Sequence, residues 1–144
     1  MRFFLATSPP NPSEFRQLLR DDLSGALVVF EGWVRASNHG RKVVRLEYEA
    51  YEPLAIQEGE RILSEAVDRF GIRDAVCCHR TGSLPVGDLA VWVGVVSAHR
   101  AEAFEGCRYI IDELKVRVPI WKKEHYEDGE TSWLEPCACC GHGK

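Results

Sequence analysis

The spacing of hydrophobic residues along the chain predicts both strands and helices. One segment, 43–51, alternates between apolar and polar residues, so we expect a strand with one solvent-facing side. Another, 25–35, has apolar residues on both faces, which predicts a strand in the middle of a sheet. β-branched and aromatic residues predict further strands at 2–7, 75–80 and 89–97.

Two longer segments repeat their apolar residues at helical spacing. The first covers about 55–70, and the second covers 99–118 and ends before Pro119. A shorter helix is expected over 11–22, and two short strands are expected around Asp128 and Gly129. These elements predict an α+β fold, in which a mostly antiparallel sheet packs against two long helices.

The composition indicates one compact domain over residues 1–136, followed by a flexible tail over 137–144. The chain has 144 residues, of which 45% are hydrophobic and 28% are charged. No apolar stretch reaches the roughly 20 residues that a membrane-spanning helix needs, so we expect no membrane association. The apolar segment at the N-terminus is too short for the core of a signal peptide, so we expect a cytoplasmic location. The net charge of −4 argues against nucleic-acid binding.

A basic cluster surrounds the end of the second long helix. Lys115 lies in its last turn, and Lys122 follows seven residues later, beyond Pro119. The two ammonium groups could converge on one pocket, with Trp121 as an apolar anchor beside Lys122. Lys115 could also be a helix-capping lysine on a solvated face, because helix C-termini attract cations.

Two further positions are candidates for anion binding. His99 and Arg100 begin the second long helix, where free backbone N–H groups favour an anion. Arg35 ends a predicted strand just before a turn, a common place for a ligand contact. Each of these could equally be an incidental polar residue at an element end.

Together these segments resemble the molybdopterin synthase large-subunit family. The resemblance runs from about residue 25 to 135, and its most specific part is a helix-ending Leu-Lys followed by Pro-x-Trp-Lys. The matching motifs, in order, are GWVRASNHG (32–40), LEYEAY (46–51), HRTGSLPVGD (79–88), VSAHRAEAF (96–104) and ELKVRVPIWKKE (113–124).

This resemblance implies an α/β hammerhead fold and a sulfur-transfer reaction. In such enzymes a small ubiquitin-like subunit carries sulfur as a thiocarboxylate on its Gly-Gly C-terminus. The sulfur passes to cyclic pyranopterin monophosphate, which becomes the dithiolene of molybdopterin, and no cofactor is implied. Two large subunits form a homodimer within a heterotetramer. The matching positions are Lys115 and Lys122 as catalytic lysines, Arg35, His99 and Arg100 as anion-binding residues, and Trp33, Val34, Lys123 and Glu124 within substrate-contact segments.

The tail departs from this pattern. Cys137, Cys139, Cys140 and His142 could bind a soft metal ion, although their spacing is tighter than in usual zinc sites. Cys77, Cys78 and Cys107 are expected in the core. The alternative function is therefore a non-enzymatic metal- or partner-binding module that uses the tail.

Overall fold

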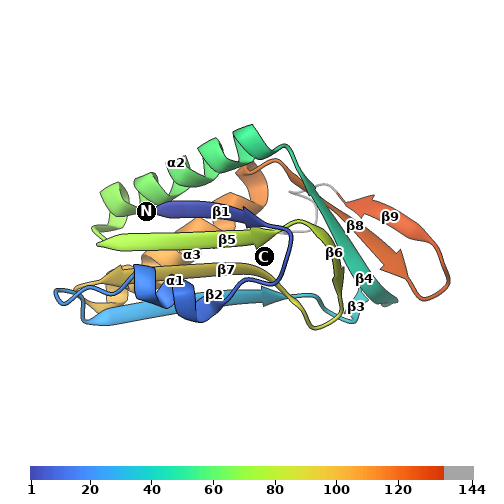
Figure 1. Ribbon diagram of the computed structural model, residues 1–144, viewed down its shortest axis with the longest axis horizontal. Coiled ribbons are helices and arrows are strands. Elements are labelled where there is room, and N and C mark those ends of the chain that lie inside the picture. The colour runs from blue at the N-terminus through green and yellow to red at the C-terminus, as the bar shows by residue number, and fades with distance from the viewer. Residues whose placement is uncertain (135–144) are drawn as a thin grey trace.

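The computed structural model describes residues 1–134 and contains two β-sheets (Figure 1). The first sheet has the strand order β1-β5-β7-β2, with β1 parallel to β5 and the other pairs antiparallel. Its strands are β1 (Arg2–Ala6), β5 (Asp74–Arg80), β7 (Leu89–Ser97) and β2 (Ala26–Trp33).

The prediction that segment 25–35 lies in the middle of a sheet is wrong, because β2 is an edge strand. Leu27 and Phe30 are 44% and 36% exposed, whereas β7 beside them is almost completely buried. Apolar residues on both faces of β2 reflect covering layers above and below the sheet. They carry no information about whether a strand has a neighbour on each edge.

Three helices cover this sheet, and the two long ones confirm the predicted α+β class. The long helices lie on one face and the short α1 lies on the other (Figure 1). Asn11 caps α1 by accepting a hydrogen bond from the Ser13 amide, and Gly71 ends α2 with a φ of 69°. No helix of the described chain is both long and apolar enough to cross a membrane. The helices are α1 (Pro12–Leu18), α2 (Glu52–Phe70) and α3 (Arg100–Arg117).

The second sheet is antiparallel and extends beyond one end of the first (Figure 1). Its long strand β4 pairs with β3, β6 and β8, and β8 pairs with β9. Two of these strands, β3 and β6, lie outside the segments in which the sequence predicted strands. Strands this short carry too few residues to show an alternating pattern. The sheet contains β3 (Ser37–Asn38), β4 (Arg41–Ala50), β6 (Gly82–Pro85), β8 (Ile120–Tyr126) and β9 (Thr131–Leu134).

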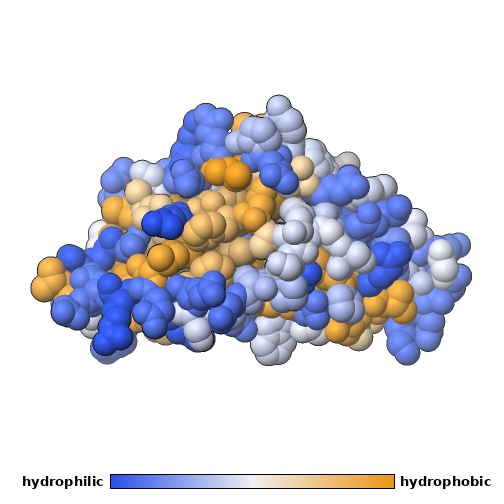
Figure 2. Space-filling view, viewed as in Figure 1, coloured by the Kyte–Doolittle hydropathy of each residue, from blue (hydrophilic) through white to orange (hydrophobic). Residues whose placement is uncertain are grey.

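The main core lies between the first sheet and the two long helices. Ile120, at the start of β8, packs against this core and also against the smaller core of the second sheet. Cys77, Cys78 and Cys107 are buried and free, as the sequence predicted, and burial raises the pKa of the Cys78 and Cys107 thiols to about 11. The opposite face of the first sheet also carries apolar residues, which gather over its middle (Figure 2).

One guanidinium ties the end of α3 to α2. Arg117 contacts Glu58 and Glu65 of α2, and also Glu113 of its own helix. Tyr109 donates a second hydrogen bond to Glu65 at 2.7 Å. These donors lower the pKa of Glu65 to about 2. Because Lys115 lies two residues before Arg117, this network fixes the part of α3 that carries the basic cluster.

We predict that Arg117→Met lowers the free energy of unfolding by about 1–2 kcal/mol, because it leaves two half-buried carboxylates without their main partner. Urea unfolding at pH 7 measures this loss. Arg61→Met is the matched control, since Arg61 is 57% exposed and forms only an i,i+3 pair with Glu58. That change should cost less than about 0.5 kcal/mol. Equal effects of the two substitutions would show that the network contributes no more than a surface pair.

Candidate active site

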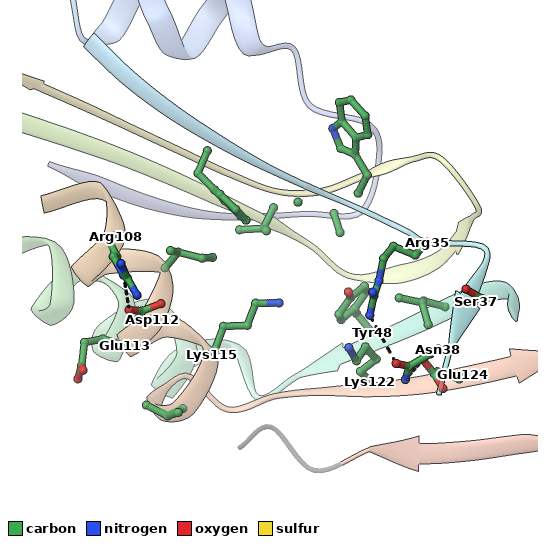
Figure 3. A pocket seen from close by; sticks show the side chains of 18 residues that line it. Arg35, Ser37, Asn38, Tyr48, Arg108, Asp112, Glu113, Lys115, Lys122 and Glu124 are labelled. Carbon is green, nitrogen blue, oxygen red and sulfur yellow. Dashed lines mark hydrogen bonds and ion pairs between the residues drawn. The ribbon is translucent and has the colours of Figure 1, made fainter. Parts of the chain in front are cut away.

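A cavity of about 630 Å³ opens where the two sheets meet the end of α3 (Figure 3). Its walls come from the ends of β2 and α3, the start of β7, and strands β4 and β8. Trp33, Arg35, Lys115, Lys122 and Glu124 of the predicted site all line it. The structure therefore brings together residues that lie up to 91 positions apart in the sequence.

The two lysines reach this cavity from different directions. Lys115 lies in the last turn of α3 and points into the cavity (Figure 3). Pro119 then ends the helical path, and β8 pairs with β4 so that Lys122 lies opposite Tyr48. Arg35 enters from the segment that follows β2, on the other side of the cavity (Figure 3). Arg35, Lys115 and Lys122 thus line one space, together with Arg108.

A hydrogen-bonded chain connects Arg35 to a buried carboxylate. Glu124 is only 3% exposed and accepts hydrogen bonds from the Asn38 amide at 2.8 Å and from the Tyr126 hydroxyl at 2.7 Å. Because the Asn38 nitrogen donates to Glu124, its oxygen is left to accept from Arg35, at 3.5 Å. Asn38 therefore orients the Arg35 guanidinium at the rim of the cavity (Figure 3).

A smaller cavity of about 40 Å³ lies beside the first and contacts the same two lysines. His79 borders it, with the ring 4.8 Å from the ring of Tyr48. The His79 Nδ1 lies 2.7 Å from the Arg80 carbonyl oxygen, so this nitrogen donates and carries the proton of the neutral ring. Burial first, and then the charges of Lys115 and Lys122, lower the pKa of His79 to about 4.

The other residues of the predicted site lie outside this cavity. Val34 is buried in the core of the second sheet, and Lys123 lies over the ring of Trp133, at 5.4 Å from its centroid. His99 and Arg100 lie at the opposite end of α3. With a rise of about 1.5 Å per residue, Arg100 is about 22 Å from Lys115 along the helix. One chain therefore has two separate groups of candidate anion-binding residues.

Sequence reasoning missed four residues at this site: Asn38, Tyr48, His79 and Tyr126. Asn38, Tyr48 and His79 lie within the quoted motifs, but the sequence provides no reason to select them from among the neighbouring residues. His79 and Tyr126 sit in strands with no local signal of function. The pairing of β4 with β6 and β8, which brings these side chains together, is not encoded in local spacing.

The predicted tail residues Cys137, Cys139, Cys140 and His142 lie outside the described residues. Among residues 1–134, no group of three or more His, Cys, Asp or Glu side chains is arranged to hold a metal ion. The chemistry that the described residues support is the binding of anions. Arg35, Lys115 and Lys122 supply positive charge, and partly enclosed surroundings strengthen their attraction for a negatively charged group.

The sequence is similar to proteins of one known family. The family profile described as "MoaE protein" matches residues 5–117. A molybdopterin synthase catalytic subunit from Pyrococcus abyssi is 50% identical over 125 residues, which cover 87% of this chain and 84% of that protein.

Solved structures show the same fold. The crystal structure of molybdopterin synthase from Staphylococcus aureus matches with a TM-score of 0.89 and 36% identity, covering 94% of this chain and 98% of that one. A Helicobacter pylori chain is 20% identical, with a TM-score of 0.75 and coverage of 92% and 90%, and therefore shows likeness of fold alone. Its structure is described as a complex of subunits 1 and 2 of molybdopterin-converting factor.

The neutral, buried His79 predicts a loss of stability in mild acid. Its pKa in the folded protein is about 4, below the ordinary value of 6.5. The unfolded chain therefore takes up a proton at a pH where the folded chain does not, so stability falls as pH drops below 6.5. Between pH 7 and pH 5 we expect the free energy of unfolding to fall by about 2 kcal/mol through this residue.

Urea unfolding of the wild type and His79→Gln across this pH range measures the effect. The variant should show a nearly flat profile between pH 7 and pH 5. The carboxylates with lowered pKa values, such as Glu65, affect stability below this window, because their stabilising effect is lost only as they take up protons. Parallel profiles for the two proteins would show that His79 does not titrate in this way.

Proposed function

The chain belongs to the MoaE family and is a catalytic subunit of molybdopterin synthase in molybdenum cofactor biosynthesis, and from this premise we propose its substrate and sulfur donor. The substrate is cyclic pyranopterin monophosphate. The donor is a small sulfur-carrier subunit with a thiocarboxylate on its Gly-Gly C-terminus. In each of two transfers, sulfur forms a bond to a substrate carbon as an oxygen substituent leaves that carbon, the carrier's own carbon–sulfur bond breaks, and water restores the carrier's carboxylate.

The cavity beside Lys115 supports the proposed substrate. Its volume of about 630 Å³ lies within the range of small-molecule sites, roughly 300–1,000 Å³. Trp33 at the rim is 65% exposed, and its indole nitrogen donates to Glu31 at 3.1 Å, which holds an aromatic surface ready for a flat pterin ring. Arg35, oriented by Asn38, supplies a planar donor group suited to the cyclic phosphate.

The single observation that carries the proposal is the convergence of Lys115 and Lys122 on this cavity. Both the substrate phosphate and the incoming thiocarboxylate are anions, which repel each other unless cations lie between them. We assign Lys115 to activation at the reacting carbon and sulfur, and Lys122 to the thiocarboxylate and the intermediate. Assembly with a small subunit agrees with the complex described for the Helicobacter pylori protein of the same fold.

We further propose that the chain forms a homodimer within a heterotetramer, and that His99 and Arg100 complete the cavity of the other copy. This arrangement accounts for their position about 22 Å from Lys115 in their own chain. We place the reaction in the cytoplasm, where the free thiols of Cys77, Cys78 and Cys107 stay reduced.

The first test is product formation with a thiocarboxylated small subunit and cyclic pyranopterin monophosphate. Lys115→Ala should lower the rate of dithiolene formation by about 10²–10³-fold, because it removes a charge that stabilises the reacting groups. Binding of the small subunit, measured by calorimetry, should change far less.

Lys42→Ala is the matched control for this test. Lys42 is 65% exposed and pairs with Glu127 on the second sheet, away from the cavity. This variant should keep the wild-type rate. A folded Lys115→Ala protein with near-normal product formation would remove Lys115 from the mechanism.

If the cavity is shared between two copies, mixing two inactive variants should restore activity. Lys115→Ala and Arg100→Ala should each be inactive alone, yet a mixture should regain up to about a quarter of wild-type activity. Random exchange places half of the dimers in the mixed form, and one of the two cavities in each mixed dimer has both residues intact. Activity is measured after the subunits exchange under mild denaturant. The control is a mixture of the Lys115→Ala protein with the Lys122→Ala protein, which should show no recovery because both lysines line the cavity of the same chain.

A further inference from the structure

Arg80 is a buried cation to which the proposed reaction assigns no task. It is the last residue of β5 and is 5% exposed. Its guanidinium donates to the Asp88 carboxylate at 3.0 Å, whereas its Nε has no hydrogen-bond partner among the described residues. Arg80 and Asp88 both lie outside the lining of the cavity. Because a buried arginine with an incomplete set of partners costs free energy through desolvation, net stability is a poor explanation for this pair.

The turn that contains Asp88 holds the chain immediately before Arg35. The Val34 amide donates to the Asp88 carbonyl at 3.0 Å, and the Val34 carbonyl accepts from the Gly87 amide at 2.8 Å. Both backbone groups of Val34 are therefore bound to one turn, in which Gly87 has a φ of 93°. Because Arg35 is the next residue, the position of this turn determines where the Arg35 side chain begins.

The chain beyond Arg35 is attached to the second sheet. The Ala36 carbonyl accepts from the Val43 amide of β4 at 2.8 Å, and the Asn38 oxygen accepts from the Arg35 guanidinium at 3.5 Å. Between these contacts the Arg35 side chain points into the cavity (Figure 3). Its direction thus depends on anchors on both sides, of which the turn at residues 87–88 is the one before it in the chain.

We propose that Arg80 is a positioning residue, which acts through Asp88 and the backbone of Val34 to hold Arg35 where it binds the substrate phosphate. This inference rests on the proposed function, which assigns Arg35 to the cyclic phosphate. Arg80 ends β5 and Asp88 directly precedes β7, so the ion pair closes the base of the segment that carries β6. Without the charge of Arg80, the Asp88 carboxylate, which is 35% exposed, is free to turn toward water. The turn that binds Val34 then loses its fixed position.

The kinetic signature of this role is a change in KM. A contact made equally with bound substrate and transition state affects KM and leaves kcat nearly unchanged. Arg80→Met should therefore raise the KM for cyclic pyranopterin monophosphate by about tenfold and change kcat by less than about threefold, at saturating thiocarboxylated small subunit. The hydrogen bond of His79 should persist, because it uses the backbone carbonyl of residue 80. Arg80→Lys, which keeps the charge, should restore most of the KM.

Hydrogen exchange measures the structural link without any substrate. In Arg80→Met, the amides of Val34 and Gly87 should exchange at least about tenfold faster than in the wild type, because the turn that joins them opens more often. Asp88→Asn is a second variant, which weakens the same ion pair without removing the buried guanidinium. It should change KM and exchange in the same direction by a smaller factor. Circular dichroism confirms that each variant is folded.

Arg73→Met is the matched control. Arg73 directly precedes β5, at the other end of the same strand, and it pairs with Asp21 in the loop before β2. This variant also loses an arginine–aspartate pair, but at the end of the sheet that lies away from the cavity. Its KM, and the exchange of the amides of residues 34 and 87, should match the wild type.

A double variant separates positioning from general loosening of the fold. If Arg80 acts only through Arg35, the protein with both Arg35→Ala and Arg80→Met should have the KM of Arg35→Ala alone. Unchanged exchange in Arg80→Met, or faster exchange with an unchanged KM, would overturn the proposal, as would equal effects of Arg80→Met and Arg73→Met. A wild type that forms no product would instead contradict the proposed function, and the exchange rates alone would then decide whether Arg80 holds the turn.

Discussion

The packing of α3 across β7 and β2 is the constraint on which the rest of the structure depends. It covers the main core, and its last turn defines one wall of the cavity. Arg117 fixes this turn against α2, so the backbone of Lys115 is held by the same contacts that hold the two long helices together. Pro119 then redirects the chain into β8, which brings Lys122 to the same space. The contacts at the end of α3 therefore both stabilise the fold and determine where the two lysines lie.

The cavity combines exposed cations with buried groups that do not compete with them for an anion. Glu124 is a carboxylate among cations, yet its oxygens are occupied by Asn38 and Tyr126. His79 is kept neutral by burial and by the two lysine charges. An anionic ligand would therefore meet Arg35, Lys115 and Lys122 without a free carboxylate of Glu124 opposing it. Among these polar residues, Asn38 also orients Arg35 through its side-chain oxygen.

Sequence patterns predicted the individual helices and strands better than they predicted which of these elements lie side by side. The periodicity of 55–70 and 99–118 identified both long helices, because helix spacing is a local property. The apolar residues on both faces of segment 25–35 wrongly placed β2 in the middle of a sheet. Burial of the two faces of a strand does not show whether another strand pairs with each of its edges. The hydrogen bond between Asn38 and Glu124 spans 86 residues, and it forms because β3 and β8 both pair with β4. The sequence placed His99 and Arg100 at the start of the second long helix and Lys115 in its last turn, and the structure confirms both positions.

Two exposed features of this chain, the edge strand β2 and the side chain of Phe104, look unfavourable in a single copy. An exposed apolar edge strand and an exposed phenylalanine are usually liabilities, because they promote association. Here both lie on the side of α3 that faces away from α2. In the homodimer proposed above, each α3 supplies Lys115 to the cavity of its own chain and His99 and Arg100 to the cavity of the other copy. On this proposal the length of α3 sets the geometry of the site, since the helix has to span from one cavity to the other.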